Sequence, residues 1–236
     1  MRSLVAICLI LLSTPEAWGD EIVDLEIALA VDASGSVDDG EFALQLMGIA
    51  SGLRDPEVRK AIRSGPRGRI ALNLVVWAEP QMPKDMSGWQ IVSTDEEAEQ
   101  VASMIESFPR RVTGATGIGA GIASALRSFD RNGITASREV VDVSGDGRET
   151  EPHETTVLIG QARHMATARG VVINGLAILN EEPDLAQWYE QNVQTGPGSF
   201  VMSVASYEDF AQAMRRKLLK EIEYRPRVSL YGPDSH

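Results

Sequence analysis

Residues 25–36 read LEIALAVDASGS, and this stretch decides the fold. Its first seven residues are almost entirely apolar, which is typical of a strand buried on both faces of a sheet. Asp32, Ser34 and Ser36 follow directly, and Gly35 permits a tight turn between the two serines. One carboxylate and two hydroxyls on one side of a loop suit a hard divalent cation. The stretch therefore predicts a buried strand that ends in a candidate metal loop, with a plain helix cap as the alternative.

Similar runs and helical periods alternate through the rest of the chain. Further apolar runs of strand length occupy residues 70–77, 140–143 and 171–179, and apolar residues recur at helical spacing within residues 42–53, 101–108, 118–129, 158–162 and 210–222. Two pairs, Thr94 with Glu97 and Ser206 with Asp209, have the spacing of reciprocal helix caps. This alternation predicts an α/β fold with a doubly wound, mostly parallel sheet flanked by helices on both faces.

The first 19 residues have the features of a signal peptide. Arg2 gives a positive start, residues 4–12 are an unbroken apolar run, and small residues stand at Ala17 and Gly19. We therefore expect cleavage after residue 19 and a periplasmic or secreted mature protein. Residues 20–224 are expected to form one domain, and residues 225–236 a mobile tail because they contain Pro226, Gly232 and Pro233.

Charge and cysteine content exclude several kinds of partner and chemistry. The chain of 236 residues carries a formal net charge of -12, which opposes binding to nucleic acid or to anionic membranes. No apolar run after residue 19 approaches the roughly 18 residues of a membrane span, so no membrane insertion is expected. The only cysteine, Cys8, lies in the leader. A disulfide framework, a cysteine nucleophile and a sulfur-ligated metal are thereby excluded for residues 20–236.

Two further segments carry oxygen ligands to the same predicted edge of the sheet. Residues 114–119 read GATGIG and place Thr116 before a helix, and residues 143–147 read VSGDG and place Asp146 at the end of a strand. In an open parallel sheet, ligands bind beyond the carboxyl ends of the strands. The candidate metal ligands are therefore Asp32, Ser34, Ser36, Thr116 and Asp146.

This set resembles the metal-ion-dependent adhesion site of the von Willebrand factor type A domain, in the same order along the chain. The resemblance covers residues 23–222 and is closest to exported bacterial proteins of unknown function that carry this domain alone. It implies that the hydroxyls bind the metal directly and that the aspartates act directly or through water. Asp142 departs from the family pattern, which has an aliphatic residue there. Because a charge inside a buried strand needs a partner, we interpret Asp142 as a hydrogen-bonded structural group, with a further oxygen ligand as the alternative.

The composition of the ligand set indicates what the metal does. Two carboxylates roughly neutralise a divalent ion, and three hydroxyls add no charge, so the metal stays electrophilic and keeps an open position. A partner protein can present an acidic side chain there. The sparse set favours Mg²⁺ or Mn²⁺ over Ca²⁺. The sequence thus predicts a metal-dependent protein-binding module and not an enzyme.

Two other functions remain open at this point. Asp32 at a strand end resembles the nucleophile of haloacid-dehalogenase-type enzymes, which would make the protein a magnesium-dependent phosphotransferase or phosphatase. Against this, Ser34 stands where such enzymes place a second carboxylate. The third reading is a scaffold whose metal is only structural.

Three other features receive structural interpretations. Trp77 is expected in the core, with a place at the border of the binding face as the alternative. Glu149 is expected in solvent beside the last loop, with a supporting position behind the metal ligands as the alternative. The basic residues of the last helix are expected to form a solvated face, with a docking surface for an acidic partner as the alternative; they are Arg215, Arg216, Lys217 and Lys220, followed by Arg225 and Arg227.

Overall fold

The structure is a computed structural model that describes residues 20–150 and 156–224. The expected signal peptide and the expected tail from residue 225 onward lie outside these residues. Within the described part of the chain, no helix is both long and apolar enough to cross a membrane.

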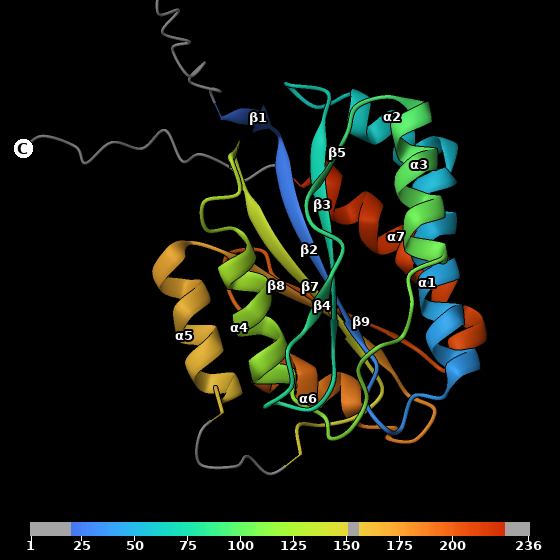
Figure 1. Cartoon of the computed structure of the whole chain (residues 1–236), viewed down its shortest axis with the longest axis vertical. Coiled ribbons are helices and arrows are strands. Elements are labelled where there is room, and N and C mark those ends of the chain that lie inside the picture. The colour runs from blue at the N-terminus through green and yellow to red at the C-terminus, as the bar shows by residue number, and fades with distance from the viewer. Residues whose placement is uncertain (1–19, 151–155, 225–236) are drawn as a thin grey trace, which may run out of the picture.

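A seven-stranded sheet forms the centre of the molecule (Figure 1). Its strand order is β4-β3-β2-β7-β8-β9, with β5 also paired to β3. All pairs are parallel except those of β4 and β5 with β3. The strands are β2 (Leu25–Asp32), β3 (Ile70–Trp77), β4 (Asp85–Met86), β5 (Gln90–Val92), β7 (Glu139–Gly145), β8 (Val172–Ile178) and β9 (Val201–Val204). A separate parallel pair joins β1 (Glu21–Val23) to β6 (Ile134–Ala136).

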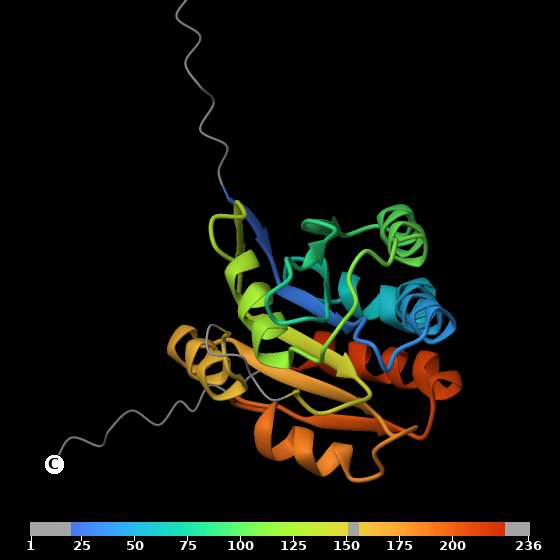
Figure 2. The ribbon, with the colours of Figure 1, turned by 60° about the horizontal axis from the view of Figure 1, so that its bottom comes forward.

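Helices cover both faces of the sheet, as Figure 2 shows. One face packs against α1 (Asp39–Arg54), α2 (Pro56–Arg63), α3 (Asp95–Glu106) and α7 (Phe210–Glu223). The other packs against α4 (Ile118–Ser128), α5 (Ile159–Arg169) and α6 (Leu185–Asn192). The doubly wound, mostly parallel α/β fold expected from the sequence is confirmed.

The alternation of side chains along β2 explains why its sequence is a continuous apolar run. Ile27, Leu29 and Val31 pack into the core on the α1 face, whereas Ala28 and Ala30 pack into the core on the α4 face. Burial of each larger side chain contributes about 1.5–3 kcal/mol to folding. Both faces are therefore apolar, and Trp77 is fully buried as expected.

The helix starts follow the sequence signals in one case and depart from them in another. Thr94 and Glu97 form the expected capping box of α3. The expected box of Ser206 and Asp209 is wrong, because a 3₁₀ turn (Tyr207–Asp209) comes first and α7 begins only at Phe210. The Ser206 side chain bonds to Glu208 instead and lowers the pKa of that carboxyl.

Lys217 contradicts the expected solvated face of the last helix. Its side chain is fully buried beneath the sheet, where Nζ lies 2.6 Å from Asp142 Oδ1 and 2.6 Å from Glu221 Oε1. Asn174 Nδ2 donates to the same Glu221 oxygen at 2.9 Å. Burial raises the pKa of Asp142 to about 7, with the charge of Glu221 adding to the effect. Asp142 is therefore a structural group, paired with a cation from α7.

Candidate metal site

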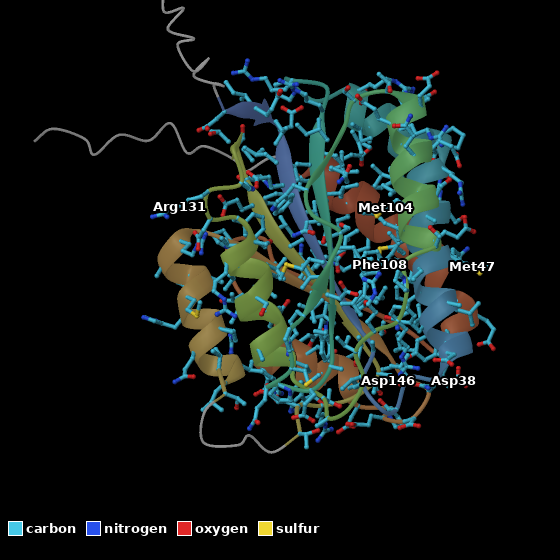
Figure 3. All side chains as sticks on the ribbon, in the orientation of Figure 1. Asp38, Met47, Met104, Phe108, Arg131 and Asp146 are labelled. Carbon is cyan, nitrogen blue, oxygen red and sulfur yellow. The ribbon has the colours of Figure 1, made fainter. Side chains whose placement is uncertain are left out.

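The candidate ligands lie where the strand order of the sheet reverses. The chain leaves β2 toward β3 on one side, while β7 pairs with β2 on the other. Asp32 is the last residue of β2, and Asp146 follows Gly145, the last residue of β7. Asp146 lies at the same end of the molecule as Asp38, at the start of α1 (Figure 3). In sheets of this kind, ligands bind at the carboxyl edge where the strand order reverses.

Hydrogen bonds connect four of the five predicted ligands. The Ser34 backbone N–H donates to Asp32 Oδ1 at 2.7 Å, and the hydroxyls of Ser34 and Ser36 lie 3.2 Å apart. The Ser36 hydroxyl donates to Asp146 Oδ1 at 2.8 Å, although the two residues are 110 positions apart. The fold thus brings Asp32, Ser34, Ser36 and Asp146 into one cluster.

The second oxygen of Asp32 bears on whether this cluster suits a metal. Asp32 is fully buried, and its Oδ2 has no hydrogen-bond partner among the described residues. Burial raises the pKa of Asp32 to about 7, and the charge of Asp146 adds to the rise. A buried carboxylate oxygen without a partner is destabilising, and a cation would compensate for it. Together with the two hydroxyls, the donor set fits a hard divalent ion.

Gly145 provides the space beside this oxygen. A Cβ at Gly145 would lie 2.8 Å from Asp32 Oδ2 and 2.8 Å from the hydroxyl of Tyr189, so a larger residue is excluded there. The Tyr189 hydroxyl is fully buried and, like Asp32 Oδ2, has no partner in the described part of the chain. Two polar atoms without partners therefore face one small space at the edge of the cluster.

Thr116 is the predicted ligand that the structure does not join directly to the cluster. Its loop reaches the metal loop through the backbone, since Gly35 N–H donates to Gly114 O at 2.7 Å. The Thr116 N–H donates to the side-chain hydroxyl of Thr150 at 3.1 Å, and the Thr116 carbonyl accepts from the Thr150 N–H at 2.9 Å. Gly117, not Thr116, is the N-cap of α4. No hydrogen bond links the Thr116 side chain to the other four ligands within the described residues, so its membership stays a prediction.

Two side chains that were not predicted from the sequence, Arg110 and Gln45, hydrogen-bond to the backbone of the candidate metal loop (residues 32–37). Arg110 Nη2 donates to the carbonyls of Ala33 at 3.2 Å, Ser34 at 3.1 Å and Val37 at 2.5 Å. Gln45 is fully buried, and its Nε2 donates to Asp32 O at 3.0 Å. Of these two residues, only Gln45 could have been recognised from the sequence, because it is a polar residue on the apolar face of a helix.

Gln45 and Tyr207 also hold the segment that carries Asp146. Gln45 Oε1 accepts from the Ser144 hydroxyl at 3.1 Å and so links the ends of β2 and β7. The Tyr207 hydroxyl donates to Asp146 Oδ2 at 3.0 Å. Each carboxylate oxygen of Asp146 thus accepts one hydrogen bond, which orients the group.

Glu149 is not solvated as expected. Its carboxylate accepts from the backbone N–H of Gly119 at 2.8 Å and of Ile159 at 3.3 Å, at the starts of α4 and α5. Burial raises its pKa. Helix N-termini favour a negative charge, so Glu149 ties these two helices to the last loop.

Among the described residues, no three His, Cys, Asp or Glu side chains could together hold a metal. A metal in this cluster therefore depends on hydroxyl ligands.

A family model described as "Protein of unknown function (DUF1194)" matches residues 22–226. The chain belongs to this family. No curated protein matches the sequence.

Solved structures show the same fold at low sequence identity. The pilus adhesin SpaC from Lactobacillus rhamnosus GG superposes with a TM-score of 0.60 at 12% identity, over 86% of this chain and 31% of that chain. Proximal thread matrix protein 1 from the mussel byssus gives 0.55 at 18% identity, over 86% and 47%. A form of that mussel protein with a zinc-occupied MIDAS motif, a metal-ion-dependent adhesion site, gives 0.54 at 15% identity, over 87% and 49%.

These likenesses concern the fold and not the whole proteins. The chain spans about a third to a half of the length of these solved structures. At such identities they show the fold alone, a mostly parallel sheet flanked by helices, over most of this chain. What the other proteins bind does not transfer with the fold.

Proposed function

We propose that this protein is a divalent-metal-dependent protein-binding module, and not an enzyme. The metal lies at the reversal of the strand order and accepts an acidic side chain from a partner protein. The observation that carries the proposal is the hydrogen-bonded cluster of Asp32, Ser34, Ser36 and Asp146. Within it, the buried Oδ2 of Asp32 has no hydrogen-bond partner in the described part of the chain.

The residues that would hold the metal are the hydroxyls of Ser34, Ser36 and Thr116, with Asp32 and Asp146 close by. Mg²⁺ or Mn²⁺ fits this oxygen set. A bound divalent ion supplies an electrophilic position that a carboxylate can complete. The chain's own residues orient the ligands: Arg110 and Gln45 hold the first loop, and Tyr207 holds Asp146.

The kind of partner and its location follow from the same reasoning. Adhesin and matrix-protein structures share the fold, one of them with an occupied adhesion site, which supports protein binding as the use of this edge. A signal peptide at residues 1–19 would bring the protein to the periplasm or the cell exterior, where it meets its partner.

Titration calorimetry of the full chain with Mg²⁺ and with Mn²⁺ tests the metal. We expect binding at micromolar to millimolar concentrations in the wild type and no heat for Asp32→Asn. The control is Asp130→Asn, since Asp130 is an exposed residue that pairs with Arg169. Equal heats for wild type and Asp32→Asn would overturn the proposal.

A further inference from the structure

A cavity of about 480 Å³ lies between the loop after β3 and α4. The loop after β3 and one side of α4 line it, with Pro80, Met82, Lys84 and Arg127 among the lining residues. Its volume falls within the range of pockets that take small ligands or side chains.

The loop that lines the cavity packs against the loop of Thr116. A Cβ at Gly117 would lie 2.8 Å from Pro80 Cγ and 2.7 Å from the carbonyl oxygen of Ala78, so the loop after β3 packs tightly against the residue that follows Thr116. The cavity therefore lies next to the loop that carries Thr116, one of the predicted ligands.

The charge of the cavity is opposite to that of the molecule. Lys84 and Arg127 line it, and no acidic residue does so among the described residues, in a protein of net charge -12. Lys84 Nζ is fixed by the carbonyls of Glu79 at 2.6 Å and Met82 at 2.7 Å. Burial and the nearby charge of Arg127 lower the pKa of Lys84 to about 8, although Glu79 opposes this shift.

Arg127 is the cation that remains available to a ligand. It is exposed near the end of α4, and its Nη2 donates to the Ser124 hydroxyl at 3.0 Å. No salt bridge of Arg127 occurs within residues 20–150 and 156–224. Guanidinium groups of this kind recognise carboxylates through paired hydrogen bonds.

An apolar rim borders these cations. Met82 is 52% exposed and lies between Pro80 and Pro83 in the lining loop. Exposed methionines provide adaptable apolar contacts at binding surfaces. The cavity thus combines a cationic wall with an apolar edge.

We propose that this cavity binds an acidic segment of the partner protein, with one carboxylate at Arg127 and an apolar side chain against Met82. The inference rests on the proposed function, because the same segment presents its other carboxylate to the metal. The cationic lining and the position next to the Thr116 loop favour an acidic peptide as the occupant.

The test is a selection of short random peptides on the full chain in Mg²⁺, with elution by chelator. We expect enriched peptides to carry two acidic positions with an apolar residue between or beside them. Arg127→Glu should weaken their binding about tenfold or more, and Met82→Ser should weaken it by a smaller factor. The control is Arg216→Glu on α7, an exposed residue with the same change of net charge.

The outcomes separate this inference from the proposed function. Equal losses in Arg127→Glu and Arg216→Glu, no loss in either, or no enrichment of acidic peptides would overturn the inference. Titration of the same variants with Mg²⁺ measures metal binding separately from peptide binding. Normal Mg²⁺ binding with no effect of Arg127→Glu would leave the metal module intact, whereas absent Mg²⁺ binding in the wild type would overturn the metal module itself.

Discussion

Arg110 shows how a single side chain can organise the metal loop without being a ligand. Its guanidinium contacts three backbone carbonyls of residues 33–37 and pairs with Asp39 at 2.7 Å. An ammonium group lacks the planar fork needed to hold several of these acceptors at once. We predict that Arg110→Lys lowers the free energy of unfolding by about 1–2 kcal/mol and weakens metal binding.

Denaturant unfolding and Mn²⁺ titration measure the two effects. The matched control is Arg111→Lys, the next residue, whose side chain is 64% exposed and pairs with Asp85. If Arg110→Lys and Arg111→Lys behave alike, the metal loop does not depend on Arg110.

The buried carboxyl group of Glu26 makes the free energy of unfolding depend on pH. Glu26 lies in β2 with its side chain buried, accepts from Asn132 Nδ2 at 2.6 Å, and has its pKa raised to about 7 by burial, with Glu139 adding to the rise. The folded state therefore binds more protons than the unfolded state between about pH 4.5 and 7, and stability falls as the pH rises through this window.

Glu26→Gln removes this proton linkage. At pH 8 we expect Glu26→Gln to be more stable than the wild type by about 1–2 kcal/mol. This is less than the roughly 1.4 kcal/mol per unit of pKa shift that full linkage would give, because solvent screening reduces the effect. At pH 4.5 we expect little gain in stability. Urea unfolding at both pH values gives the comparison, with the exposed Glu96→Gln as control. A gain that is the same at both pH values would contradict the raised pKa.

At the scale of the elements, α7 is joined to the sheet by a buried ionic group. Lys217 from this helix lies between Asp142 of β7 and Glu221 of its own next turn. Removing the cation leaves two buried carboxylates facing each other. We predict that Lys217→Met lowers the free energy of unfolding by about 3–5 kcal/mol at pH 8 and by less at pH 5, where Asp142 can take up a proton.

Thermal and urea unfolding of Lys217→Met and of the exposed Arg216→Met measure this difference. A loss below about 1 kcal/mol in Lys217→Met, or one independent of pH, would show that the ionic group does not hold α7 to the sheet.

The main elements could be predicted from the sequence because burial on two faces leaves a continuous apolar run. Four central strands carry such runs, and β2 carries the clearest. Five helices instead carry apolar residues at helical spacing. By contrast, β9 is short and partly exposed, and α2 and α6 have few buried residues, so their patterns are weak. Lys217 was misassigned because a helical pattern does not reveal a buried charge whose partner comes from a distant strand.

The candidate site could be predicted only for the side chains that carry oxygen at strand ends. Asp32, Ser34, Ser36 and Asp146 meet because parallel strands share one edge. Arg110 could not be found in this way, because its partners are backbone carbonyls more than 70 positions away and leave no trace in the residue pattern.

For the whole molecule, the α/β architecture brings the oxygen-bearing side chains of Asp32, Ser34, Ser36 and Asp146 together at one edge of the sheet. The family match extends to residue 226 and so includes α7, which packs into the core. Tyr207, just ahead of this helix, donates to Asp146. We propose that this edge holds one divalent ion. Binding to the folded state alone would stabilise the protein by about 2.7 kcal/mol at a free metal concentration of 100 times Kd.

Anomalous diffraction from crystals of the full chain grown with Mn²⁺ tests this claim most directly. We expect one strong peak about 2.0–2.3 Å from the hydroxyl oxygens of Ser34 and Ser36, with Thr116 in or next to the coordination shell and Asp32 and Asp146 around it. A structure with no peak at these serines in saturating Mn²⁺, or with the ion bound elsewhere, would contradict it.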